Sequence, residues 1–201
     1  MASYSAIAAA GKSLERLLTK RFAIDVPVNQ GNATRAVLVR TDDFNRAGTT
    51  VIQPPVLSIF LVRVDINAVM RPAWSAVGAD DGRSHLPLDL HFLLTPWASN
   101  AEHELRILGS AMRCLDETPL LSGPLLDTTH GAGFATDEAL QIVPGDLGPE
   151  GIRSIWDTLD ADFRLSVPYC VRVVRIDSDV AASSDPPVLT AAVGTTPSLD
   201  R

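Results

Sequence analysis

The chain has 201 residues, of which 46% are hydrophobic and 20% charged, as in an ordinary globular protein that folds as a single domain. Its net charge of -7 disfavours nucleic acid as a partner, because the phosphates would be repelled. No segment approaches the roughly 18 consecutive apolar residues of a membrane helix, so we expect no membrane partner either.

The first third predicts one helix followed by short strands. Ile7, Gly11, Leu14 and Leu18 share one face of a helix over residues 3–19, and Lys12 makes this segment amphipathic rather than a secretion signal. Short strands are expected at residues 23–30 and 34–40, separated by an Asn/Gly turn.

The strongest strand pattern is VLSIFLVRVDIN at residues 56–67, which follows two prolines and is rich in β-branched and aromatic residues. Residues 68–84 carry turn residues without a period, which predicts a long loop between two paired strands. Residues 86–94 then predict a half-buried strand, with Asp89 and His91 on the face opposite to Leu88, Leu90, Phe92 and Leu94.

Residues 95–100, TPWASN, predict a turn that leads into a helix over residues 100–117. Ser99 or Asn100 would cap this helix. Its apolar positions recur at alternating steps of three and four, which predicts a buried stripe formed by Leu105, Leu108, Met112 and Leu115.

The C-terminal part predicts a loop at residues 118–138, a short strand at 139–145, a helix that begins at Pro149, and a long strand at 164–177. The apolar stripe of this helix is expected to contain Ile152, Ile155, Trp156 and Leu159. One face of the last strand is expected to contain Val167, Tyr169, Val171 and Val173.

Together these elements predict an α+β fold in which a mainly antiparallel or mixed sheet carries helices on one face. We place the domain at residues 1–177 and a C-terminal tail at 178–201.

The usual patterns of catalytic and metal sites are missing. The four histidines lack HxxxH or HExxH spacing, no GxSxG is present, and the GAG at residues 131–133 stands alone. Cys114 and Cys170 lie among apolar residues without CxxC spacing, which predicts buried free thiols. We therefore expect no catalytic residues, no metal and no cofactor, although a pair of carboxylates that meet in space remains compatible with the sequence.

Asp89 and His91 are the one pair that suggests chemistry, since they share a strand face about 6.5–7 Å apart. They form either an acid/base dyad of a small enzyme or ligand-binding module, or the polar edge of a structural strand. Trp74 and Trp97, which we expect in loops beside prolines, either pack on the protein or anchor an interface.

Four motifs in order resemble one family. These are LERLL, PPVLSIFLVRVDIN, LPLDLHFLLTPWASNAEHELRILGSAMRCLDETPLL and IRSIWDTLDADFRLSVPYCVRVVRID. Over about residues 3–177 they look like the cap, or tail-terminator-like, proteins of extracellular contractile injection systems, which are phage-tail-derived particles of the antifeeding-prophage and virulence-cassette type. The chain departs from that pattern at Phe92, where Tyr is more usual, and in its tail.

This resemblance implies a structural role in a phage tail-terminator-like fold. The subunits would form a ring, hexameric in the family, that closes the inner tube and sheath at the end distal to the baseplate. The implied partners are further copies, sheath protein and inner tube protein. Assembly would take place in the cytoplasm, and the chain would be a component of a phage-tail-like particle that either is released or stays in the cytoplasm. The segment PPVLTAAV at residues 186–193, which includes Pro187, Val188 and Leu189, either adds as a strand to a sheath subunit or a neighbouring cap subunit, or belongs to a disordered tail.

Overall fold

The structure of the chain is a computed structural model that describes residues 4–29, 31–44, 51–75, 79, 82–127, 134, 138–159 and 161–180. Its elements are α1 (Ala6–Asp25), β1 (Arg35–Val39), a 3-10 turn (Thr41–Asp43), β2 (Val56–Ile66), β3 (His85–Trp97), α2 (Ala101–Glu117), β4 (Leu120–Ser122), a second 3-10 turn (Gly123–Leu125), β5 (Ala139–Pro144), α3 (Pro149–Thr158) and β6 (Val167–Asp177).

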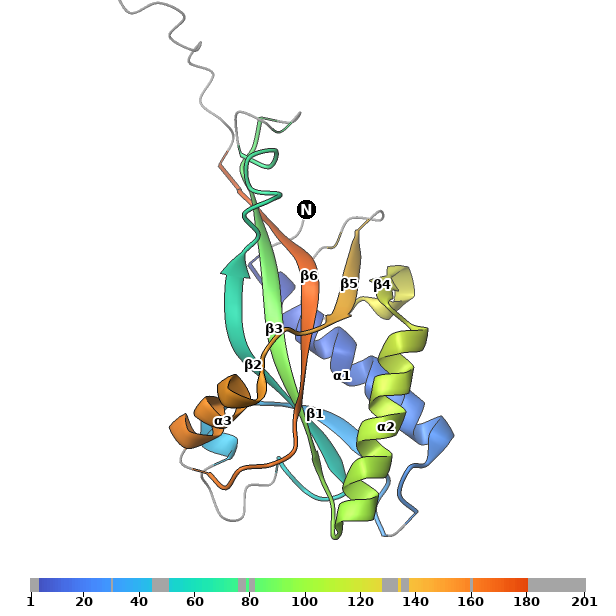
Figure 1. The fold of residues 1–201 in the computed structure, drawn as a ribbon. Coiled ribbons are helices and arrows are strands. Elements are labelled where there is room, and N and C mark those ends of the chain that lie inside the picture. The colour runs from blue at the N-terminus through green and yellow to red at the C-terminus, as the bar shows by residue number, and fades with distance from the viewer. Residues whose placement is uncertain are drawn as a thin grey trace, which may run out of the picture.

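The six strands of the described residues form one mixed sheet in the order β1-β2-β3-β6-β5-β4 (Figure 1). β1 pairs with β2 in parallel, and each of the other neighbouring pairs is antiparallel. The predicted α+β class with a mainly antiparallel or mixed sheet is therefore confirmed. β3 is the longest strand and has a partner on both sides, so it forms the centre of the sheet.

Two helices cover one face of this sheet, as expected, whereas the third lies on the other face (Figure 1). On the first face the alternating β3 residues Leu88, Leu90, Phe92 and Leu94 join one core with α1 and α2. On the second face Leu93 packs with Trp156 and Leu159 beneath α3. The period of two along β3 thus separates a large core from a small one.

The predicted strand at residues 23–30 is wrong, because α1 continues to Asp25 and the described residues that follow it form no strand. Phe22 is 1% exposed and extends the stripe of Leu14 and Leu18 by one more step of four. That helical burial outweighs the alternation of Ile24 and Val26, which are both exposed.

The described part of the connection between β2 and β3 forms no strand, as predicted, but the turn at residues 95–100 begins later than expected. Thr95, Pro96 and Trp97 still belong to β3 and pair with residues at the start of β2. The chain turns only at residues 98–100, where the Asn100 side chain accepts a 2.9 Å hydrogen bond from the His103 backbone N–H and begins α2 as predicted.

The buried stripe of α2 differs from the prediction. Leu105 and Met112 are 57% and 41% exposed, although Leu108 and Leu115 are buried as expected. The buried stripe is completed by Ile107, Ala111 and Cys114. The smaller Ala111 and Cys114 lie where α2 packs into the core that it shares with α1. The predicted and the observed buried residues both recur at steps of three and four, so the spacing alone does not distinguish the two stripes.

Two further details were not predicted. β4 lies within the expected loop at residues 118–138, where the fully buried Leu121 pairs with Leu140 of β5. In β6 the alternation shifts, so that Val171 and Val174 are buried while Val173 is half-buried. The shift follows from an irregular register, since Leu90 pairs with Val171 but Leu88 pairs with Val174.

Candidate functional site

Asp89 and His91 of β3 have separate partners and do not form a dyad. The Asn67 side-chain amide donates hydrogen bonds of 3.2 and 3.1 Å to the two carboxylate oxygens of Asp89. The His91 Nε2 atom lies 3.0 Å from the Asp65 carboxylate and 3.3 Å from the Arg63 guanidinium. Among the described residues, Asp89 and His91 are joined by neither a hydrogen bond nor an ion pair.

The network around His91 lies on the protein surface. Arg63 Nε is 2.8 Å from the carboxylate of Asp65, and these two side chains are 52% and 44% exposed. Exposed pairs of this kind are screened by solvent and contribute little to stability. Within the described chain no hydrogen bond connects His91 to a serine, threonine or cysteine, so the network lacks a nucleophile that the imidazole could activate.

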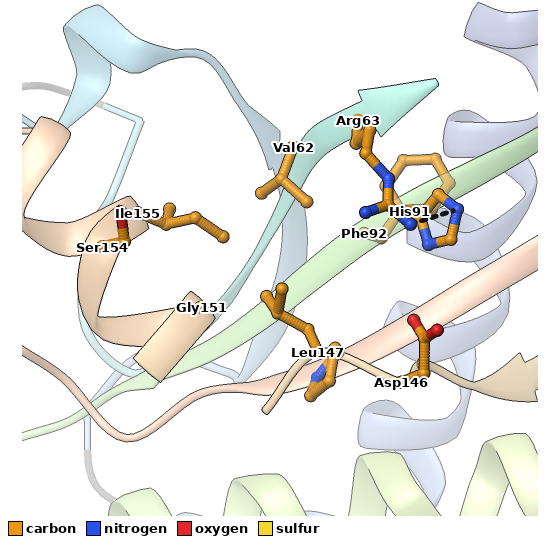
Figure 2. Close-up of a pocket in the computed structure, with 11 residues that line it drawn as sticks. Val62, Arg63, His91, Phe92, Asp146, Leu147, Gly151, Ser154 and Ile155 are labelled. Atoms are coloured by element: carbon orange, nitrogen blue, oxygen red, sulfur yellow. Dashed lines mark hydrogen bonds between the residues drawn. The ribbon is translucent and has the colours of Figure 1, made fainter. Parts of the chain in front are cut away.

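A pocket of about 260 Å³ lies next to this network, between the sheet and the segment that contains α3. Figure 2 shows Val62, Leu147 and Ile155 around the hollow, with Ser154 on the side away from His91. The pocket is lined by Val62, Arg63, His91, Phe92, Gly145, Asp146, Leu147, Gly151, Ser154, Ile155 and Pro168. Because its polar groups lie mainly at the Arg63 and His91 end, it suits an apolar side chain better than a charged ligand.

The wall of this pocket is closely packed at Gly145. A Cβ atom at Gly145 would lie 2.9 Å from the Pro168 Cβ atom, so any larger residue would push the segment before α3 away from β6. The Gly145 N–H also donates a 2.9 Å hydrogen bond to the Pro168 carbonyl. These contacts hold the pocket wall against the sheet.

Trp97 lies at the end of β3 rather than in the expected loop, and it is half-buried. Its indole N–H donates a 2.9 Å hydrogen bond to the Ser58 hydroxyl. The Arg164 guanidinium lies 4.2 Å from the ring centre, and Phe44 and Trp156 contact the ring from other sides. These contacts are internal packing, and the role of Trp97 as an assembly contact remains a prediction.

Trp74 lies in the connection between β2 and β3 and is also half-buried. Its carbonyl accepts a 2.8 Å hydrogen bond from the His85 N–H, and its ring packs edge-on against the His85 ring. His85 Nδ1 is 2.7 Å from the carboxylate of Asp177, which also lies 2.8 Å from Arg175 Nε. Trp74 thus ties the connection to the start of β3 and the end of β6, and its predicted assembly role is likewise untested.

Cys114 and Cys170 are free and buried, as predicted. Burial raises the pKa of both thiols, that of Cys170 to about 11, so neither is a nucleophilic thiolate near neutral pH. No three His, Cys, Asp or Glu residues of the described segments are grouped so as to hold a metal ion. The predicted contact residues Pro187, Val188 and Leu189 lie outside the described residues, as does His130.

The sequence did not indicate that Leu105 and Met112 would be exposed. Both lie on α2 and present large apolar side chains to solvent. The signal in the sequence is that the apolar residues of α2 cover a wider arc of the helix than one buried stripe, so some of them have to lie outside the core.

A family model matches residues 9–190, which is most of the chain, and its description is Pvc16 N-terminal domain. The chain belongs to the Pvc16 N-terminal domain family. The family that the sequence motifs predicted is thereby confirmed. No protein of curated function matches the chain in sequence.

Two solved structures have the fold of this Pvc16 N-terminal domain. The PVC sheath/tube terminator of an extracellular contractile injection system in its extended state has 20% identity and a TM-score of 0.55, with 96% of this chain and 65% of that chain covered. The anti-feeding prophage cap, a tube terminating cap, has 18% identity and a TM-score of 0.50, with 90% and 59% covered. This Pvc16 N-terminal domain chain therefore spans about two thirds or less of each of these structures.

No helix in the described part of the Pvc16 N-terminal domain combines the length and the apolar character required to cross a lipid bilayer.

Proposed function

We propose that the chain is a structural subunit that ends the inner tube and the sheath of a contractile injection system. The observation that carries this proposal is the family match over residues 9–190, supported by the fold shared with a sheath/tube terminator and a tube terminating cap. Six copies would form a ring at the end distal to the baseplate and stop the addition of further tube and sheath rings. The ring would assemble in the cytoplasm and remain part of the finished particle, whether that particle is released or stays in the cell.

The distribution of exposed apolar side chains supports an assembly role. A ring subunit has to contact two neighbouring copies, the tube and the sheath, so it needs several separate contact surfaces. Among the described residues, large exposed apolar residues occur at the end of α1 and directly after it, on β2, α2 and β4, and before β6. They include Ile24, Val26, Val64, Ile66, Leu105, Met112, Leu120, Phe163 and Leu165.

The enzyme or ligand-binding alternative has less support. It depends on Asp89 and His91 acting together, whereas each of these side chains is held by a different residue of β2 or of the connection that follows it. An Asp89→Asn variant discriminates the two functions. A structural Asp89 predicts altered stability or assembly alone, whereas a catalytic Asp89 predicts the loss of an activity.

Electron microscopy of particles tests the terminator function. Particles produced without this chain should have tubes and sheaths of variable length with open ends, and a tagged chain should label only the end opposite the baseplate. A label distributed along the sheath, or normal closed ends without the chain, would contradict the proposal. Averaging of the labelled ends gives the number of copies in the ring.

A further inference from the structure

The second half of β2 has an unpaired edge. β1 pairs with β2 only as far as Phe60, whereas β2 continues to Ile66 with β3 on its other side. Among the described residues, no strand pairs with residues 61–66 on the β1 side. The N–H and C=O groups along this edge can therefore form a ladder with an additional strand.

The side chains of this edge favour such a strand. Val64 and Ile66 are 43% and 57% exposed, and Val62 lines the apolar pocket beside α3. Residues 61–66 contain neither Lys nor Pro, which commonly protect edge strands, and the charges of Arg63 and Asp65 neutralise each other at 2.8 Å. An added strand would gain backbone hydrogen bonds from the edge and place apolar side chains on it and in the pocket.

The structure assigns this edge to residues 187–193 of a second copy of the chain, which we propose add to it as an antiparallel strand. The segment at residues 186–193, PPVLTAAV, is uncharged and apolar apart from Thr190, which suits an apolar edge of neutral net charge. Its two prolines favour an extended backbone at the start of the strand. The proposal rests on the proposed function in one respect, namely that copies of the chain lie next to one another.

The position at which the tail begins supports this occupant. Asp177, the last residue of β6, pairs with His85, and Ile66 at the end of the open edge pairs with Leu88 of the same strand. The tail therefore starts at the end of the sheet where the open edge of β2 also ends. Because an extended chain spans about 3.3 Å per residue, residues 181–187 can reach roughly 23 Å from there.

The chain's own edge is obstructed. To reach it, the tail would have to cross β3 and the connection between β2 and β3, which projects from this same end of the sheet (Figure 1). Connections at one edge of a sheet rarely cross one another. A tail that arrives from a neighbouring copy can approach the open edge from outside the sheet and need not cross its own β3, so exchange between copies is favoured over pairing within one chain.

Cysteine cross-linking of the full-length chain tests the exchange. One variant carries Val64→Cys, and three others carry Val188→Cys, Leu189→Cys or Thr190→Cys in the tail. Each tail variant is mixed with Val64→Cys at the highest concentration at which the chain stays in solution, and then oxidised gently. We expect a disulfide-linked pair of chains from at least one mixture, while the buried Cys114 and Cys170 stay reduced.

Leu120→Cys provides the matched control. Leu120 is 53% exposed and lies on β4 at the opposite edge of the sheet. The proposal is overturned if Leu120→Cys cross-links to the tail as well as Val64→Cys does, or if none of the three mixtures yields a linked pair. It is also overturned if a chain that carries both Val64→Cys and a tail cysteine forms only an intramolecular disulfide.

Charge on the edge provides a second test. Ile66→Lys, in the Val64→Cys chain, should reduce the yield of the linked pair several-fold, whereas Leu120→Lys in that chain should not.

Particle microscopy separates the strand exchange from the terminator function. Labelled particle ends without cross-links overturn the strand exchange alone, whereas cross-links without labelled ends overturn only the terminator function.

Discussion

The two faces of the sheet differ in how completely they are closed. On the face covered by α1 and α2, one continuous core of the described residues includes residues from both helices and from all six strands, with Phe22 and Phe92 each 1% exposed. On the face of α3, the buried cluster consists of Leu93, Trp156 and Leu159, and beside it lie the pocket and the exposed Arg63–Asp65–His91 network. The first face therefore carries most of the stability, while the second leaves surface available for contacts.

The largest effect is expected from a cavity on the closed face. Phe22→Ala should lower the free energy of unfolding by about 3–5 kcal/mol, because a large buried ring is removed from a core that cannot collapse fully. Urea denaturation followed by circular dichroism measures this loss. A loss below about 1 kcal/mol would mean that the end of α1 does not contribute to the core as its burial indicates.

A smaller effect is expected from a cavity beneath α3. Leu159→Ala should cost about 2 kcal/mol, at the lower end for buried leucine, because the short α3 can move toward the sheet. Hydrogen exchange should show faster opening of α3 than of α1. If Leu159→Ala destabilises the chain as much as Phe22→Ala, the two faces of the sheet contribute equally to the free energy of unfolding. That result would contradict the difference between the faces described above.

The junction of α1 and α2 should make stability depend on pH. Hydrogen bonds from Arg113 and Ser110 hold the pKa of Asp25 below its usual value, so its ionised form stabilises the fold. This contribution is complete above the unfolded-state pKa of about 3.9 and is lost as pH falls through the lower folded-state value. Asp25→Asn should therefore be less stable than the parent near pH 7, and the two should converge in acid.

Thermal unfolding at a series of pH values measures this difference. Asp157→Asn is the control, because Asp157 is an exposed residue of α3 in a weak pair with Arg153. A constant gap between parent and Asp25→Asn at all pH values would assign the effect to packing rather than to charge.

The smallest effect is expected on the open face. Asp65→Asn removes the carboxylate that contacts both Arg63 and His91, but these side chains are partly exposed, so the loss should be within about 1 kcal/mol. Denaturation in low and high salt would measure it. A loss of several kcal/mol would show that the network is structural rather than a solvated surface.

Strong periodicity explains which elements could be predicted from the sequence. β2, the body of β3, α2 and α3 have long apolar patterns and clear start signals, and their positions agree with the prediction. Residues 23–25 could not be assigned correctly from local alternation, because Phe22 meets its core partners only in the folded chain. The shift at Val173 likewise depends on the register with β3, which a single strand does not encode.

The candidate site was less predictable than the fold. The sequence places Asp89 and His91 two residues apart, but their partners Asn67 and Asp65 come from the preceding strand and connection, about 22 residues or more away in the chain. The open edge of β2 depends on where β1 stops, and hence on pairing between strands. Only the neutral, apolar character of residues 186–193 could be read directly from the sequence.

The arrangement of β3 between β2 and β6 has a mechanical consequence. β3 is 13 residues long and antiparallel to both neighbours, so β2 and β6 run in the same direction on either side of it. A force that pulls β3 lengthwise against these two strands acts on both hydrogen-bond ladders in shear, and many bonds must break together rather than one after another. Along this axis the domain should resist tension most strongly, whereas the three-residue β4 at one edge can peel away under a much smaller force.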